Sequence, residues 1–339
     1  MADGNAVVCF GELLLRLNAP GRERLLQSGK FDVHVGGAEA NVAVSLAQFG
    51  CDARMATIVA ENALGQAALE ELRRYGVDIS ACMRRKGRMG LYFMSSGAVR
   101  RPSEILYDRA ASAFAEAAPD ALDWPAVLNG AGWLHLSGIT PAVSPNAAEA
   151  ALRAVKTARD CGVKVSFDGN YRAQLWAEWG GDGPDILRRI LASADLAFIN
   201  ERDVGLILGR EYRECGASAR KEAYTDAFAA FPGLGMIAAT TRRQGSVDDH
   251  SLSAMIATRN GEWTSRDCDL PGVVDRIGAG DAFAAGVLYA LIEKRDVQHA
   301  VDFGAAAAAM KHSVPGDFNI AAVAEVDQAM VDDGLDVRR

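Results

Sequence analysis

The sequence predicts an α/β protein: a three-layer αβα sandwich around a mainly parallel central sheet, with a small β-sheet lid. Short apolar runs alternate with helical stretches along most of the chain, and such repeated units give a parallel sheet covered on both faces. Two stretches, residues 13–35 and 90–108, interrupt this alternation with strand-like segments. The 339 residues, 50% of them hydrophobic, suffice for one large core.

The alternation can be followed element by element. The first helical stretch places Val42, Leu46 and Phe49 on one face, and Gly50 ends it. The expected strands are residues 6–10, 54–59, 133–136, 163–167, 196–199 and 236–240. The expected helices are residues 39–49, 63–75, 146–161, 201–208, 281–293 and 299–311. Glycine follows the first four of these helices, as it commonly does where a helix ends.

The two interrupting stretches mix polar and apolar residues, as a small exposed sheet does. Residues 13–35 contain LLLRL and FDVHV, and residues 90–108 contain GLYFM and EILY. We interpret them as one antiparallel lid built from two excursions of the main domain, with two ordinary surface hairpins as the alternative. The main domain then covers residues 1–325, and residues 326–339 form a C-terminal tail.

Composition excludes several classes of protein. Lys and Arg number 36 against 44 Asp and Glu, so the net charge is −8 and the basic surplus of a nucleic-acid-binding protein is missing. No run reaches the roughly 18 apolar residues that span a bilayer, and the first residues lack a signal-peptide pattern. The six cysteines are scattered without a C-x-x-C pair, so we expect reduced thiols in a cytoplasmic protein. From the charge and the apolar runs we expect no nucleic-acid or membrane partner.

The strongest chemical signal is the segment DRIGAGDAF, residues 275–283, directly before an apolar helical stretch. Gly278 and Gly280 let successive backbone N–H groups face one concavity, and the helix N-terminus adds partial positive charge, which makes a cradle for a phosphoryl group. Asp281 in the first helical turn is expected to be ionised and to accept a proton from an attacking hydroxyl. The alternative is that Asp281 only caps a helix after a glycine turn.

Two other phosphate-binding motifs do not fit the sequence. The Gly29-Lys30 pair is followed by Phe31, so it is not a Walker A loop. Phe283 stands where a dinucleotide-binding fingerprint has its third glycine, and the segment lies far from a first βαβ unit. These departures disfavour a nicotinamide-dependent dehydrogenase.

Together with GGAEAN at residues 36–41, the segment 275–283 resembles the two signatures of the ribokinase-like carbohydrate kinases of the phosphofructokinase B type. The order and separation of the motifs match that family, and the resemblance covers about residues 6–322. It implies a helix-covered parallel sheet with a β-sheet lid over a sugar, and a reaction that uses ATP and Mg²⁺. It leaves open whether a monovalent cation such as K⁺ is needed.

The resemblance assigns roles at the phosphate end of the site. It makes Asp281 the catalytic base and the backbone of Gly278, Ala279 and Gly280 the anion hole for the transferred phosphate. Gly278 and Gly280 would also contact the nucleotide. The family's threonine is replaced by Arg276, which leaves the local nucleotide contacts unassigned.

The resemblance also assigns residues to the sugar and to the metal. Gly36 and Gly37 would allow the chain to approach the sugar closely, and Asn41 would hydrogen-bond its hydroxyls. Asn200 and Asp203 resemble the family's N-x-x-E element, which helps to hold magnesium and phosphate. Asp203 keeps the charge of the usual glutamate but has a shorter reach, so any contact with the metal is expected to be indirect.

Four further side chains indicate an anionic sugar. Tyr92 and Tyr107 lie in the second lid segment, and Arg109 closes it. Arg172 follows the strand expected at 163–167, where ligands of parallel sheets bind. Two guanidinium groups can hold a carboxylate bidentately, and this set, with the stretches NYRAQLW and KHSVPGD, resembles the 2-keto-3-deoxygluconate kinases. A surface salt bridge is the alternative for either arginine.

The resemblance therefore implies an ATP-dependent kinase that phosphorylates the terminal hydroxyl of 2-keto-3-deoxy-D-gluconate. A fructokinase or another neutral-sugar kinase of the same fold is the nearest alternative. A non-catalytic sugar-acid sensor is the alternative from another class. Exposed lid edges invite pairing between subunits, so we also expect a homodimer formed through the lid.

Overall fold

The apolar runs form one ten-stranded central sheet in the computed structural model, which describes residues 4–212, 216–246 and 248–331. Its strands are β1 (Ala6–Phe10), β4 (Ala53–Ala60), β5 (Cys82–Arg85), β8 (Ala131–Ser137), β9 (Lys164–Asp168), β10 (Leu196–Phe198), β11 (Met236–Gln244), β12 (His250–Thr258), β13 (Gly261–Thr264) and β14 (Cys268–Leu270). Their order is β13-β12-β11-β10-β9-β8-β1-β4-β5, with β14 paired to β12. Neighbours from β5 to β11 run parallel, and the pairings of β12 are antiparallel.

Helices cover both faces of this sheet. One face carries α1 (Ala38–Gln48), α2 (Ala63–Arg74), α10 (Ala279–Ile292), α11 (Val297–Lys311) and α12 (Val323–Val331). The other face carries α3 (Trp124–Val127), α4 (Ile139–Ala142), α5 (Pro145–Asp160), α6 (Ala173–Trp179), α7 (Gly183–Leu191), α8 (Glu201–Leu208) and α9 (Ala217–Ala230). Along β1, Val7 and Cys9 pack into the first core cluster and Val8 and Phe10 into the second, because side chains alternate along a strand. The expected three-layer fold is confirmed.

Helix α12 crosses the boundary at which we placed the C-terminal tail. Val326 of this helix is buried against the first core cluster, so the domain continues beyond residue 325. Residues 332–339 of the expected tail lie outside the described residues. No helix in the described part of the chain is long and apolar enough to cross a membrane.

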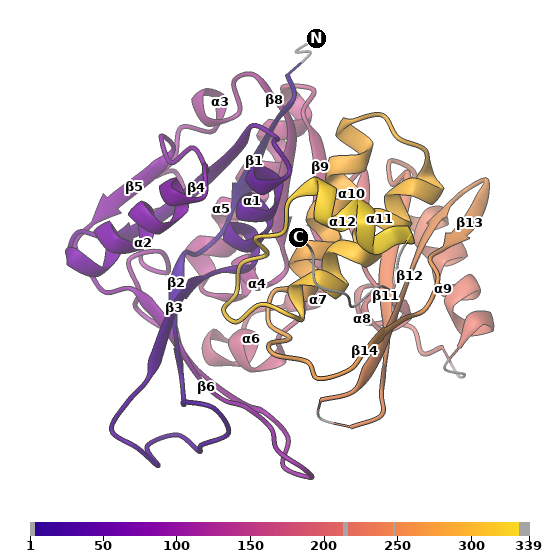
Figure 1. Ribbon diagram of the computed structural model, residues 1–339. Coiled ribbons are helices and arrows are strands. Elements are labelled where there is room, and N and C mark those ends of the chain that lie inside the picture. Colours follow the sequence, from indigo (N-terminus) through magenta and orange to yellow (C-terminus); the bar gives the residue numbers. More distant parts are fainter. Residues whose placement is uncertain (1–3, 213–215, 247, 332–339) are drawn as a thin grey trace.

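The two excursions form a separate sheet, as expected for a lid. It consists of β2 (Leu14–Asn18), β3 (Asp32–Gly36), β6 (Gly90–Ser95) and β7 (Glu104–Asp108), in the order β3-β2-β6-β7. In Figure 1 it projects from one edge of the central sheet, at the lower left of the view. The expectation of an antiparallel lid is wrong at its centre, since β2 and β6 pair in parallel. The reason is that β2 follows β1 and β6 follows β5. Both therefore start at the carboxyl ends of parallel strands and run in the same direction.

Candidate active site

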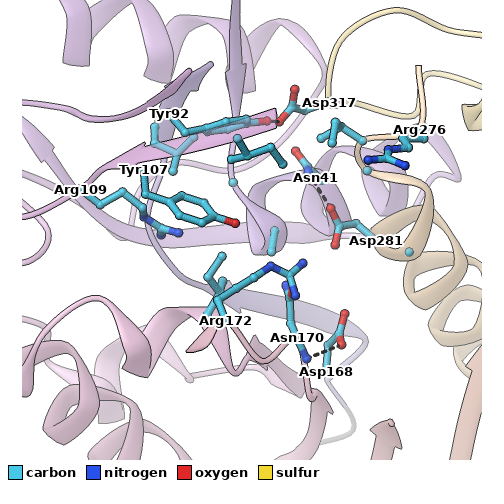
Figure 2. Close-up of a pocket in the computed structure, with 18 of the residues that line it drawn as sticks. Asn41, Tyr92, Tyr107, Arg109, Asp168, Asn170, Arg172, Arg276, Asp281 and Asp317 are labelled. Atoms are coloured by element: carbon cyan, nitrogen blue, oxygen red, sulfur yellow. Dashed lines mark hydrogen bonds between the residues drawn. The ribbon is translucent and has the colours of Figure 1, made fainter. Parts of the chain in front are cut away.

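A cavity of about 370 Å³ lies between the lid and the carboxyl ends of the central strands. Lid strands contribute Leu14 and Tyr92 to its wall, the end of β9 contributes Asp168, and the loop before α10 contributes Ile277. Figure 2 shows side chains from these separate parts of the sequence pointing into one space. The predicted residues on its wall are Gly37, Asn41, Tyr92, Tyr107, Arg109, Arg172, Gly278, Gly280 and Asp281.

The glycine cradle has the backbone that its sequence requires. Gly278 has a φ of 82°, in the left-handed region, and a Cβ there would lie 2.0 Å from the backbone oxygen of Asp317. Helix α10 begins at Ala279, which is buried behind the cavity wall, and no atom lies within 4 Å of a Cβ built on Gly280. The first N–H groups of a helix lack intrahelical partners, so this turn offers donors and partial positive charge to an anion.

Asp281 lies in the first turn of α10, where Asn41 of α1 holds it. The Asn41 side-chain amide donates a hydrogen bond of 2.6 Å to Oδ2 of Asp281, drawn in Figure 2. Burial raises the pKa of Asp281 to about 8; the Asn41 bond opposes this rise, and the nearby Asp168 and Glu39 carboxyls add to it. Burial therefore opposes the ionisation that the helix N-terminus was expected to favour at Asp281.

Arg109 is fixed on the opposite side of the cavity by a buried ion pair. Its Nε lies 2.6 Å from Oε2 of Glu12, and the two side chains are 3% and 1% exposed. Ser112 donates a hydrogen bond to the other Glu12 oxygen, and a Cβ at Gly90 would clash with that oxygen at 2.3 Å. The pair is therefore no surface salt bridge. Arg172, in contrast, is exposed at the mouth of the cavity, and its terminal nitrogen donates to the neighbouring backbone oxygen of Tyr171.

Asn200 and Asp203 lie outside this cavity, in an adjoining one of about 230 Å³. The two cavities share Asp168, Asn170, Arg172 and Gly280. Asn200 and Asp203 form a capping box on α8: the Asn200 side chain accepts from the backbone N–H of Asp203, and the Asp203 carboxyl accepts from that of Asn200. Burial, and next the Asp203 carboxyl, raise the pKa of Asp168 to about 7. Among the described residues, no group of three or more His, Cys, Asp or Glu side chains is placed to hold a metal ion.

Gly36 does not line the cavity; it makes room for a buried charge network instead. A Cβ on Gly36 would lie 2.2 Å from Oδ2 of Asp317. That carboxyl accepts a 2.8 Å hydrogen bond from the Tyr92 hydroxyl and forms a 3.1 Å ion pair with Arg16. Arg16 also binds Asp275, with its terminal nitrogen 2.5 Å from Oδ2, and Asp275 heads the glycine segment. The network thus joins lid strands to the phosphate cradle.

Comparison with known proteins agrees with this geometry. Residues 5–321 match the description pfkB family carbohydrate kinase. The chain belongs to this family. A 2-dehydro-3-deoxygalactonokinase from Haloferax volcanii is 30% identical over 324 residues, which are 96% of each chain. A 2-dehydro-3-deoxygluconokinase from Bacillus subtilis is 28% identical over 317 residues, covering 92% of this chain and 91% of the relative. The crystal structure of a 2-dehydro-3-deoxygluconokinase from Thermotoga maritima is 36% identical and has a TM-score of 0.91, covering 96% of this chain and 99% of that chain.

Sequence reasoning missed several residues of this carbohydrate kinase site. Glu12 comes just after β1 and Asp168 closes β9, so both follow the rule that functional groups gather at the carboxyl ends of parallel strands. The same rule indicated Arg172, and it could also have indicated Glu12 and Asp168. Asp317 ends the quoted stretch KHSVPGD, without an assigned role. The sequence did not indicate a structural role for Arg16, because a charged residue in an exposed strand is expected to face solvent.

Proposed function

We propose that this pfkB-family enzyme is an ATP-dependent sugar-acid kinase acting on the terminal hydroxyl of 2-keto-3-deoxy-D-gluconate. The observation that carries the proposal is that Asp281, beside the glycine cradle, and two arginines, Arg109 and Arg172, line one cavity. A hydroxyl to be phosphorylated and a carboxylate at the other end of the same small molecule match this set. The names of the relatives, which specify 2-dehydro-3-deoxy sugar acids, support the substrate class.

In this reaction Asp281 serves as the general base. The acceptor oxygen bonds to the γ-phosphorus of ATP while the bond between that phosphorus and the bridging oxygen breaks, and ADP leaves. The hydroxyl proton passes to Asp281, whose pKa of about 8 lies near an ordinary working pH, as suits a base that must also release the proton. Phosphoryl transfer has a loose transition state, so positioning and charge stabilisation contribute more than base strength.

The phosphate end of the site fits ATP and Mg²⁺. The N–H groups that follow Gly278 would donate to the transferred phosphate at the helix terminus. Burial and the Asp203 carboxyl make the negative charge of Asp168 unfavourable, and carboxylate oxygens are the donors that Mg²⁺ prefers alongside phosphates and water. Asp168, and Asp203 with Asn200, would hold Mg²⁺, which when bound neutralises phosphate charge. Two carboxylates suffice, since Mg²⁺ completes its shell from substrate oxygens and water.

The acceptor end of the site fits a carboxylate. Glu12 occupies Nε of Arg109, which leaves the two terminal nitrogens of that guanidinium for a ligand. Arg172, which is exposed at the mouth of the cavity, would add a second guanidinium. Tyr107 lies between them in Figure 2 and offers a hydroxyl to the sugar chain. The lid strands would close over the bound acceptor and exclude water, which competes as an acceptor.

We further propose that the enzyme works as a homodimer formed through its lid and in the cytoplasm. The exposed apolar residues of the lid, such as Val33 and Leu106, support the first proposal. Cys9, Cys51, Cys82 and Cys161 are free thiols, which fits a reducing compartment.

The test is ADP release, measured by a coupled assay over a panel of acceptors. The panel holds 2-keto-3-deoxy-D-gluconate, its C4 epimer 2-keto-3-deoxy-D-galactonate, and fructose, and we expect kcat/KM for the gluconate to exceed that for fructose by about 100-fold or more. Preference for the galactonate would show that the other epimer is the substrate, and the enzyme would still be a sugar-acid kinase. Preference for fructose would establish a neutral-sugar kinase, and sugar-acid binding with no turnover would establish a sensor. Replacing K⁺ by tetramethylammonium in this assay tests the monovalent-cation requirement.

Two variants assign the residues in the same assay. Asp281→Asn should lower kcat by about 10²–10⁴-fold with little change in either KM, since it removes the base but keeps the shape. Arg172→Ala should raise KM for the sugar acid and leave KM for ATP unchanged. Turnover of the Asp281→Asn enzyme within a few-fold of the parent would contradict the assigned base.

A further inference from the structure

Two arginines that have no assigned role lie on the cavity wall near the phosphate cradle. Arg276 precedes Ile277 and Gly278 in the loop that leads into α10, and Arg242 lies near the end of β11. Figure 2 shows Arg276 above the turn that carries Asp281. Both arginines line the cavity that contains the cradle.

The two side chains lack partners in the protein. Across the parts of the chain that the structure describes, neither Arg242 nor Arg276 forms an ion pair or a side-chain hydrogen bond. Other arginines around the site differ in this respect, since Arg16 binds Asp275 and Arg109 binds Glu12. Five N–H donors on each unpaired guanidinium therefore remain available to a ligand.

The two arginines are also close enough to affect each other. Burial lowers the pKa of Arg242, and the positive charge of Arg276 lowers it further. Like charges placed together without a compensating carboxylate destabilise the free protein, and a bound anion removes that cost. The pair thus favours a ligand with several negative charges at this end of the cavity.

A nucleoside triphosphate carries more negative charge than one Mg²⁺ neutralises. Its terminal phosphates must reach the cradle at Gly278 and Gly280 if the γ-phosphoryl group is to meet an acceptor beside Asp281. The position of Arg276, two residues before Gly278, brings a guanidinium to that same turn. Guanidinium groups hold phosphate oxygens bidentately and stabilise charge on a moving phosphoryl group.

We propose that Arg242 and Arg276 form a clamp for the β- and γ-phosphates of ATP. The inference rests on the proposed function for the identity of the nucleotide. It assigns the task to side chains that the two signature motifs do not supply, since Arg276 stands where the family pattern has threonine. The carboxylate of the acceptor is the competing ligand. The clamp is the better match because the proposed function already assigns Arg109 and Arg172 to that carboxylate.

The test measures nucleotide binding directly, without any sugar. Isothermal titration in MgCl₂ compares ATP, ADP and AMP for the parent, Arg242→Gln and Arg276→Gln. Each variant should weaken ATP and ADP by about tenfold or more, because a charge-assisted hydrogen bond is lost. AMP, which has only the α-phosphate, should bind each variant as it binds the parent.

Arg243→Gln is the matched control. Arg243 is the next residue on β11, its side chain points to the other face of the strand, and it pairs with Asp267 at 2.7 Å. We expect this variant to bind all three nucleotides as the parent does. Thermal unfolding tests whether each variant is folded. Arg276→Lys keeps the positive charge but loses the forked guanidinium, so its affinity for ATP should lie between that of the parent and that of Arg276→Gln.

Several outcomes would overturn the proposal. Unchanged ATP and ADP binding in both glutamine variants would show that the two arginines do not hold the phosphates. An equal loss of AMP binding would move the contact to the α-phosphate or the nucleoside. Weakened binding of 2-keto-3-deoxy-D-gluconate with unchanged nucleotide binding would assign the arginines to the acceptor. Because no acceptor is present in the nucleotide titrations, they decide the clamp even if the acceptor panel contradicts the proposed substrate.

Discussion

At the scale of single residues, the site contains buried carboxyl groups, and burial makes their ionisation unfavourable. Burial raises the pKa of Asp281 to about 8 and that of Asp168 to about 7, and both line the same cavity. Such shifts arise where carboxyl groups are withdrawn from water near each other, and they are typical of sites that bind cations or move protons. Asn41 opposes this shift at Asp281, because the hydrogen bond that its amide donates favours the charged carboxylate.

Asn41→Ala should move the pH dependence of turnover to higher pH. The Asn41 hydrogen bond stabilises the Asp281 carboxylate and so lowers its pKa; without the bond the pKa rises further above about 8. A base acts only when deprotonated, so the rising limb of kcat/KM for the sugar acid should shift upward by about one pH unit. Gln48→Ala, at the far end of α1, where the side chain binds the backbone oxygen of Tyr75, should leave the limb in place. A limb that does not move in Asn41→Ala would show that another group titrates.

At the scale of elements, the inner face of the lid is tied to the phosphate cradle. The strand register places His34, Arg16, Tyr92 and Tyr107 in one row across the four lid strands. Arg16 is 1% exposed and binds Asp275 and Asp317, and Tyr92 binds Asp317 as well. Burial raises the pKa of Asp275, but the bond to Arg16 and its charge outweigh this, so the pKa lies below its usual range.

Arg16→Met should destabilise the protein far more than removal of an exposed ion pair. The variant leaves Asp275 and Asp317 buried without their guanidinium partner, which costs about 3–5 kcal/mol of unfolding free energy. Arg22→Met is the control: its pair with Asp248 is about half exposed on both sides, so its loss should cost about 1 kcal/mol or less. Urea unfolding measures both, and equal losses in the two variants would contradict a structural role for the network.

The same elements show what the sequence can and cannot predict. Alternating apolar runs and helical stretches were enough to predict the parallel part of the sheet, six of the helices that cover it and the two lid excursions, because periodicity reflects burial directly. The helices α3, α4, α6, α7, α9 and α12 were not expected. The parallel pairing of β2 with β6 was not predictable from either segment alone, since it depends on where both leave the central sheet. The glycine motif indicated Asp281, but its raised pKa depends on Asp168 and Glu39, which reach it only in three dimensions.

At the scale of the whole molecule, the outer face of the lid is apolar and uncovered. Val33, Leu17, Phe93 and Leu106 form one row across β3, β2, β6 and β7, on the face opposite to the Arg16 row. Val33 is 59% exposed and Leu106 is 52% exposed. A four-stranded sheet with one polar face against the site and one apolar face toward solvent gains stability by pairing with a second copy of itself.

The double variant Val33→Glu and Leu106→Glu should therefore be monomeric where the parent is dimeric, because it buries four like charges across a two-fold interface. Leu64→Glu, equally exposed at 53% but on α2 away from the lid, should remain dimeric. Light scattering coupled to size exclusion measures both.

Because Tyr92 and Tyr107 lie on the other face of the same strands, the monomer should also show a raised KM for the sugar acid and unchanged ATP binding. A parent protein that is monomeric at micromolar concentration would remove the interface, and a monomeric variant with unchanged KM would show that pairing does not support the acceptor side of the site.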